Sequence, residues 1–141
     1  AAIIRLTSSA LPTFGFMRGN TFYYDRQITI ASGQSNTTES TINMATFVPP
    51  ETLHWNGNLE IGVLHGVAAA QAHYNLRVTT GVDYIRPTIN TGATATTNYT
   101  SENFSIPNVG QSIFTRWTDA NGNTVDGNIF LQSYTIPNGG N

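Results

Sequence analysis

The chain has no cysteine and no lysine. Without cysteine there is neither a disulfide framework nor a thiolate metal site, so the fold must rest on side-chain packing and backbone hydrogen bonds. All six basic residues are arginines, and they are scattered along the 141 residues rather than gathered into a stripe. Because binding to a nucleic-acid backbone requires clustered cations, a chain with a net charge of -2 and no such cluster is not expected to bind nucleic acid.

Long hydrophobic runs are missing as well. The longest, residues 62–72, is interrupted by His65 and Gln71. It falls short of the roughly 20 apolar residues that a membrane-spanning helix needs, so no membrane partner is expected. Residues 1–5 do not read as a signal peptide. A chain that was exported and then lost an earlier segment is compatible with this start.

Charged residues make up only 10% of the chain, well below the roughly 25% that is usual for soluble domains. Threonine, asparagine, serine and glycine take their place, and these residues suit strands, turns and hydrated surfaces. A chain of this length can bury one core without a metal or a disulfide. We therefore expect a single domain over residues 1–136 and a flexible C-terminal tail over residues 137–141.

Alternation with a period of two residues is the clearest pattern, and it is typical of half-buried β-strands. In residues 21–30, Phe22 and Ile30 fall on one face of such a strand while Tyr23 falls on the other. Residues 67–79 include an alanine-rich stretch that suits a helix, but their sustained alternation favours a strand. The same pattern predicts further strands at residues 38–48, 98–106, 111–118 and 127–136.

Turn residues separate these segments. The two prolines at residues 49–50 cannot continue a central strand, because proline has no N–H to donate. Asn56-Gly57 stands between two apolar arms in residues 53–59 and predicts a tight hairpin turn. Residues 88–97 have few apolar side chains and are expected to form a surface loop or an edge strand. Short strands with turns between them and no convincing helix predict an all-β, antiparallel β-sandwich, with a jelly roll as the expected arrangement.

Sequence signatures of catalysis are absent. There is no G-x-S-x-G elbow, no H-E-x-x-H, no phosphate-cradling glycine loop and no C-x-x-C. We therefore expect a protein that is not an enzyme and has no cofactor. The histidines His54, His65 and His73 do not predict a metal site. His65 and His73 are eight residues apart, which on one strand is about 26 Å and too far for a single ion.

One segment carries oxygen-bearing side chains at spaced positions, namely Asp119, Asn121, Asn123 and Asp126. Calcium prefers such hard oxygen ligands, which makes this segment the candidate metal site. It departs from an EF-hand loop, since its glycine falls at the fourth position and Phe130 stands where a glutamate is needed. The alternative interpretation is a hairpin turn in which the aspartates accept hydrogen bonds from nearby backbone.

Aromatic residues raise the question of a sugar site. Trp55, Trp117 and the six tyrosines would suit a carbohydrate-binding platform, because aromatic faces beside amides fit sugar rings. The alternative is core packing and cross-strand pairing, since aromatic residues are enriched in sheets. Trp117 follows Ile113 in an alternating segment, which favours packing.

The last part of the chain consists of four blocks, at residues 104–110, 112–117, 119–123 and 128–136. Together they resemble the closing strands of jelly-roll virion proteins, such as phage head-decoration proteins and small trimeric capsid or fibre-head domains. The resemblance implies a structural protein that forms trimers or caps a lattice such as a capsid shell. It implies no catalytic residue.

Low charge together with small hydroxyl and amide side chains suits a surface that is buried against neighbouring copies. The residues expected at subunit contacts are Tyr23, His73 and Arg77, which lie on the second face of their strands. A long, neutral sheet edge would also need covering, and oligomerisation is one way to cover it.

The sequence therefore predicts a non-enzymatic structural or assembly protein of a virion, of capsid or capsid-decoration type, or of another extracellular array. We expect it to act as a homo-oligomer, a trimer by the resemblance, at the virion surface or in an extracellular location. The alternative is a carbohydrate-binding module of the lectin or adhesin kind.

Overall fold

A computed structural model describes residues 3–8, 11–64, 70–79, 82–91, 97–120 and 124–137. Strands and one short 3-10 helix account for the regular structure of these residues. In chain order the elements are β1 (Ile3–Ser8), β2 (Leu11–Arg18), β3 (Thr21–Gln34), β4 (Ser40–Asn43), η1 (Met44–Thr46), β5 (His54–Leu64), β6 (Ala70–Thr79), β7 (Val82–Ile85), β8 (Thr88–Thr91), β9 (Thr97–Pro107), β10 (Ser112–Thr118) and β11 (Thr124–Thr135). No helix within the described ranges has the length and apolar character to cross a membrane.

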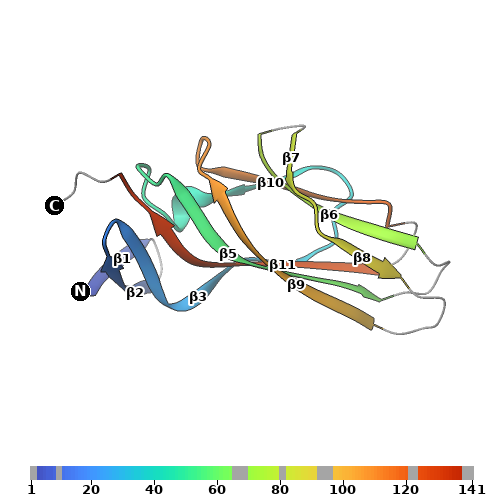
Figure 1. Ribbon diagram of the computed structural model, residues 1–141, viewed down its shortest axis with the longest axis horizontal. Coiled ribbons are helices and arrows are strands. Elements are labelled where there is room, and N and C mark those ends of the chain that lie inside the picture. Colours follow the sequence, from blue (N-terminus) through green and yellow to red (C-terminus); the bar gives the residue numbers. More distant parts are fainter. Residues whose placement is uncertain are drawn as a thin grey trace.

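The strands form two antiparallel sheets, which confirms the predicted all-β sandwich. The first sheet has six strands in the order β1-β2-β3-β11-β5-β9. The second has the order β4-β10-β6-β7, and β8 also pairs with β6. Figure 1 shows the strands running along the long axis, with the β1–β2 hairpin at the end of the molecule where β11 finishes.

The strand pairs are nested along the chain. β3 pairs with β11, β4 with β10, β5 with β9, and β6 with β8, all antiparallel. The chain from β3 to β11 thus folds back on itself as one long ribbon of paired strands. The β3–β11 and β5–β9 pairs belong to the six-stranded sheet, and the β4–β10 and β6–β8 pairs belong to the five-stranded sheet. The β1–β2 hairpin extends the six-stranded sheet beyond this ribbon, because β2 continues the sheet beside β3.

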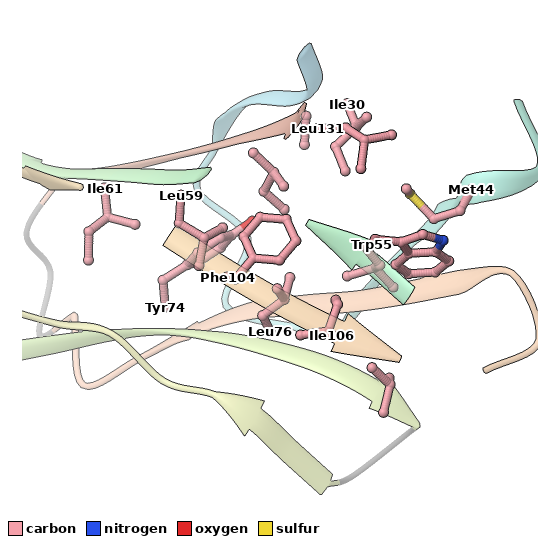
Figure 2. Close-up of a cluster of buried hydrophobic side chains, with 14 of the residues drawn as sticks. Ile30, Met44, Trp55, Leu59, Ile61, Tyr74, Leu76, Phe104, Ile106 and Leu131 are labelled. Atoms are coloured by element: carbon pink, nitrogen blue, oxygen red, sulfur yellow. The ribbon is translucent and has the colours of Figure 1, made fainter. Parts of the chain in front are cut away.

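The core lies between the two sheets and is built from the inward-facing residue of each alternating pair. Strand β10 shows the principle, since its buried positions Ile113, Thr115 and Trp117 alternate with half-buried ones. The Trp117 indole N–H donates to the Gln34 carbonyl at 2.8 Å, so this ring is buried with its polar atom satisfied. Figure 2 shows how side chains from both sheets meet, among them Trp55, Leu59, Tyr74, Leu76, Phe104 and Ile106.

The predicted hairpin at Asn56-Gly57 is wrong, because β5 runs without a break from His54 to Leu64. Gly57 is required for a different reason. A Cβ at this position would collide with the Phe130 carbonyl oxygen and lie 2.7 Å from the Phe104 ring. The glycine therefore allows close approach of the neighbouring strand and ring, and this tertiary demand overrides the local turn propensity.

Several predicted boundaries shift. The strand expected at residues 38–48 is shorter, since β4 ends at Asn43 and η1 follows, where the Asn43 carboxamide oxygen accepts from the Ala45 N–H at 3.0 Å. The strand predicted in residues 67–79 is confirmed from Ala70 onward as β6. In residues 88–97 the described part is the strand β8, at the margin of its sheet. The predicted tail at residues 137–141 lies beyond the described chain except for Pro137.

Candidate functional site on the outer face of the six-stranded sheet

The segment expected to bind calcium connects the two sheets. β10 belongs to the five-stranded sheet and β11 to the six-stranded one, so the hairpin-turn interpretation of residues 119–126 is wrong. Asp119, with a φ of 58°, begins this crossing in a backbone conformation that aspartate tolerates better than most residues. Asn121 and Asn123 lie outside the described residues.

The two aspartates of this segment have partners within the chain. Asp119 Oδ2 lies 3.4 Å from the Arg86 guanidinium and 3.6 Å from His73 Nε2. Asp126 Oδ2 accepts from the Asn128 amide at 3.4 Å. In the part of the chain that the structure describes, no group of three or more histidine, aspartate or glutamate side chains could hold a metal ion. Calcium at this segment therefore stays a prediction, without a described ligand cluster to carry it.

The three residues expected at subunit contacts are not brought together. Tyr23 lies on the six-stranded sheet and is 37% exposed. His73 lies on the other sheet, where its Nδ1 is 2.7 Å from Thr88 Oγ1. Arg77, also on that sheet, has a side chain only 6% exposed and paired with Glu39 at 2.8 Å. Of the three, Tyr23 has the most side-chain surface to offer a partner, whereas Arg77 is engaged inside its own chain.

Both tryptophans are core residues, which confirms the packing interpretation, and neither of them lines a sugar-binding platform. Trp55 is 0% and Trp117 is 1% exposed. Three of the tyrosines share the interior. Burial raises the pKa of Tyr74 to about 12, with a further upward contribution from the Asp126 charge. Burial likewise raises the pKa of Tyr134 to about 12.

The outer face of the six-stranded sheet is not covered by any strand of the other sheet in the described residues. Phe22, Trp55, Ile106 and Tyr134 point inward from its strands. Strand alternation therefore turns their sequence neighbours outward. We call a set of uncharged outward residues the ladder face; they are Phe16, Thr21, Tyr23, Asn56, Asn58, Asn103, Ser105, Ser133 and Thr135. Two charged residues lie beside them on the same face, Arg18 opposite Thr21 and Glu60 opposite Ser101.

Register places one row of this face across five strands. Phe16 is opposite Tyr23, and Tyr23 is opposite Ser133 on β11. Ser133 is opposite Asn56 on β5, and Asn56 is opposite Ser105 on the edge strand β9. The row thus begins with two aromatic rings and continues in hydroxyl and amide groups.

Cross-strand hydrogen bonds hold the polar side chains of the ladder face. Asn56 Nδ2 donates to Ser133 Oγ at 3.1 Å, and Asn58 Nδ2 donates to Asn103 Oδ1 at 3.1 Å. The hydroxyls of Thr21 and Thr135 are 3.2 Å apart. Such pairs stabilise a sheet and restrict the rotamers of their members. A partner that docks here therefore has less side-chain entropy to remove than on an ordinary polar surface.

The aromatic end of the row is an exposed stacked pair. The Phe16 and Tyr23 ring centroids are 5.3 Å apart with an interplanar angle of 17°. Phe16 is 42% exposed, more than Tyr23. Sequence reasoning missed Phe16 because no strand was predicted over residues 11–18. The alternation of Phe14 and Phe16 with smaller residues would have indicated that strand, but only the register shows that Phe16 meets Tyr23.

Comparison with known proteins adds no family. No protein-family model matches the chain, and no curated protein matches it either. The ladder face with its aromatic pair joins two exposed rings to a row of uncharged polar side chains, a combination that suits a partner.

Proposed function

We propose that the chain is a non-enzymatic structural or assembly protein of a virion, of capsid or capsid-decoration type, or of another extracellular array, acting as a homo-oligomer. The observation that carries this proposal is the ladder face, which ends in the exposed Phe16–Tyr23 stack. An exposed aromatic pair beside uncharged, rotamer-restricted side chains has the composition of a protein interface, where aromatic residues are enriched and charged ones depleted.

The nested strand pairs support the finer part of the fold prediction, a jelly roll with an added N-terminal hairpin. Jelly rolls occur in capsid proteins and also in lectins, so this connectivity is compatible with both hypotheses. The two hypotheses differ in the kind of partner that the outer surface must bind. A sheet face whose side chains are already bonded to one another favours a broad protein partner over a small sugar ring, which needs a concave site.

The aromatic pair also argues for burial against protein. One face of each ring is already covered by the other ring, so neither residue offers an isolated platform for a sugar. A neighbouring subunit would instead cover both rings together. Fully burying an aromatic side chain contributes about 1.5–3 kcal/mol, so these two residues can act as the anchor of the contact.

A specific observation favours the alternative, a carbohydrate-binding module. Tyr99 on β9 is 57% exposed. Its ring lies across Gly62 of β5, at the place where a Cβ would otherwise stand. A single ring held against the sheet in this way is the arrangement on which a sugar can stack. Substituting Tyr99→Ala and measuring binding to a glycan array tests this alternative, because loss of a glycan signal would support it.

The native mass of the purified chain tests the leading proposal. We expect a homo-oligomer, a trimer by the resemblance, whose mass does not change when calcium is added or chelated. Tyr23→Arg should shift the mass toward the monomer, because it places a charge in the centre of the contact. The matched control is Tyr84→Arg, at an exposed tyrosine on β7 of the other sheet, which should leave the mass unchanged.

Two outcomes would contradict the proposal. A monomeric wild-type chain at every concentration tested would remove the homo-oligomer. Equal responses to Tyr23→Arg and Tyr84→Arg would remove the ladder face as the contact. Binding of calcium with a change in mass would move the function toward a metal-dependent module built on residues 119–126.

A further inference from the structure

The strands at the edges of the two sheets differ in length and in the regularity of their pairing. β1 has six residues, and β4, β7 and β8 have four each. β7 also carries register shifts against β6. β9 has eleven residues and pairs with β5 in an unbroken register from Thr97 to Pro107. Short or irregular strands are the usual way to protect a sheet edge, so β9 is the edge that this fold leaves open.

The backbone groups that β9 turns outward can be identified. The Asn108 N–H donates to the Leu53 carbonyl at 2.8 Å, which fixes the phase of the antiparallel ladder. Residues at even positions of β9 therefore bond to β5, and those at odd positions point away from it. The outward N–H and C=O groups thus belong to residues such as Tyr99, Ser101, Asn103 and Ser105, all of which are exposed. No strand in the described ranges pairs with this side of β9.

The usual chemical protections are also missing along this edge. β9 has no lysine and no bulge, and its proline, Pro107, stands at the last position. Its one charge is Glu102, which is opposite Leu59 but exposed, and the nearest charge on β5 is Glu60, opposite Ser101. The side chains beside the outward backbone groups are uncharged. A regular, neutral edge of this length is a template for another strand.

We propose that β9 pairs with β9 of a second copy of this chain, antiparallel, about a two-fold axis at Ser101. A second copy suits this edge because a two-fold contact must be self-complementary, and the residues whose backbone groups point outward are uncharged and so place no like charges directly opposite each other. An axis at Ser101 uses the outward groups of residues 97–105 in full. It places Glu102 opposite Thr100, so the two copies of Glu102 do not face each other.

This pairing joins two six-stranded sheets into one continuous sheet and makes their ladder faces one surface. It rests on the proposed function only in that a second copy is the partner. β9 and the β1–β2 hairpin lie at opposite margins of the six-stranded sheet. A two-fold contact at β9 and a separate contact at the Phe16–Tyr23 pair can therefore form together, and two different contacts on one subunit are what an extended array requires.

Engineered cysteines test the pairing, because the chain has no cysteine of its own. Opposite residues in an antiparallel pair have Cα atoms about 5.5 Å apart when they exchange hydrogen bonds, within the range that a disulfide or a short bis-maleimide can bridge. Ser101→Cys should give a covalent dimer at least ~10-fold faster than Gln27→Cys, an exposed control on β3 that lies away from the edge. A mixture of Tyr99→Cys and Asn103→Cys should form the mixed dimer in preference to either self-dimer.

Cross-linking of all these variants at the rate of Gln27→Cys would overturn the proposal. Efficient self-cross-linking of Asn103→Cys in place of Ser101→Cys would overturn the axis position while supporting the pairing of the two edges. Both measurements are made on the full chain, and the native mass before cross-linking confirms that each variant is folded and associated.

Ser101→Pro supplies a second measurement. Proline at an outward position removes an N–H that β5 does not use, so it is tolerated on an edge strand but blocks addition of another strand. We expect the two-fold contact to be lost, so that the mass of the assembly falls at unchanged circular dichroism, and an unchanged mass would count against the pairing. If Ser101→Cys cross-links while Tyr23→Arg leaves the mass unchanged, the β9 pairing stands and the aromatic contact fails, so the two proposals are tested separately.

Discussion

The outer faces of the two sheets are built on opposite principles. On the five-stranded sheet, Arg77 is buried in a pair with Glu39, and Asn75 is buried with its amide donating to Thr118 Oγ1 at 3.0 Å. Asp119 adds contacts to Arg86 and His73. On the six-stranded sheet, the ladder face consists of uncharged side chains whose polar groups bond across strands, and the exposed charges Arg18 and Glu60 lie beside it without an ion-pair partner in the described residues.

This difference between the two outer faces shows that the chain uses several of its few charged residues to fix connecting segments to the five-stranded sheet. Glu39 precedes β4 and Asp119 follows β10, so the charged groups of the five-stranded sheet attach connecting segments to its outer surface. That face is thereby engaged within its own chain. In the described residues no ion pair attaches a connecting segment to the ladder face, which leaves its uncharged row of side chains and the edge strand β9 for a partner.

The largest expected effect concerns the interior that the two faces share. Tyr74 comes from β6 and Tyr134 from β11, and burial raises the pKa of each to about 12 from an unfolded value of 10.0. Burial also raises the pKa of Tyr24. The unfolded chain therefore loses tyrosine protons first as the pH rises, so the stability that is present below pH 10 is lost between pH 10 and about 12. Each tyrosine contributes up to about 1.4 kcal/mol per pH unit in this window.

Urea unfolding at about pH 9 and about pH 11 measures this loss. Because the two sheets pack on one core, tryptophan fluorescence and circular dichroism should report a single transition that moves to lower urea at the higher pH. Phenolate absorbance from all six tyrosines while the chain is still folded would contradict the burial. Two separate transitions would show that the sheets do not depend on each other.

The next largest effect is expected at the buried ion pair of the five-stranded sheet. Arg77→Ala should lower the free energy of unfolding by about 2 kcal/mol, because it removes a side chain that is only 6% exposed together with its charged hydrogen bond to Glu39. Arg18→Ala, at an exposed arginine on β2, is the control and should change stability by less than about 0.5 kcal/mol. Equal effects in urea unfolding would show that the charged face does not depend on Arg77.

The strands themselves were largely predictable because alternation is a local property. The predicted strand at residues 111–118 is β10 almost to the residue, and its buried positions are those of one parity. Asn56-Gly57 led to a wrong hairpin prediction because turn propensity is also a local property. Gly57 is needed because a side chain there would collide with Phe130, which is far along the chain. β10 and β11 belong to different sheets because each pairs with strands far away in the chain. No turn signal in residues 119–126 reveals this.

The candidate site was predictable only in part. Tyr23 was found because an aromatic residue stood on the outward parity of an alternating strand. Its partner Phe16 depends on the β2–β3 register, and β2 was not predicted. The same parity rule places Arg77 on the outward face of its strand. Parity cannot show that Glu39, from a connecting segment, pairs with the Arg77 side chain. Cross-strand neighbours and covering segments are tertiary facts that one sequence does not display.

A smaller effect should separate the ladder face from an ordinary polar surface. A double-mutant cycle with Asn58→Ala and Asn103→Ala should give a coupling energy of about 0.5 kcal/mol, since the two amides are opposite each other and bonded. A cycle of Asn58→Ala with Gln27→Ala, whose side chains are not bonded, is the control and should give none. A zero coupling for the first pair would mean that the ladder face is not held in place.

The smallest effect on stability is expected at the exposed Arg86–Asp119 pair of the five-stranded sheet. The side chains of Arg86 and Asp119 are 48% and 59% exposed, so their pair is worth little in water. Arg86→Ala should lower the free energy of unfolding by about 0.3 kcal/mol, and that difference should vanish at about 1 M salt, where charges are screened over about 3 Å. The effect of Arg77→Ala should be less sensitive to the same salt, because the Arg77 side chain is only 6% exposed. If the two arginine variants respond equally to salt, then the five-stranded face is open to solvent throughout, and the contrast between a closed, charged face and an open, neutral one is lost.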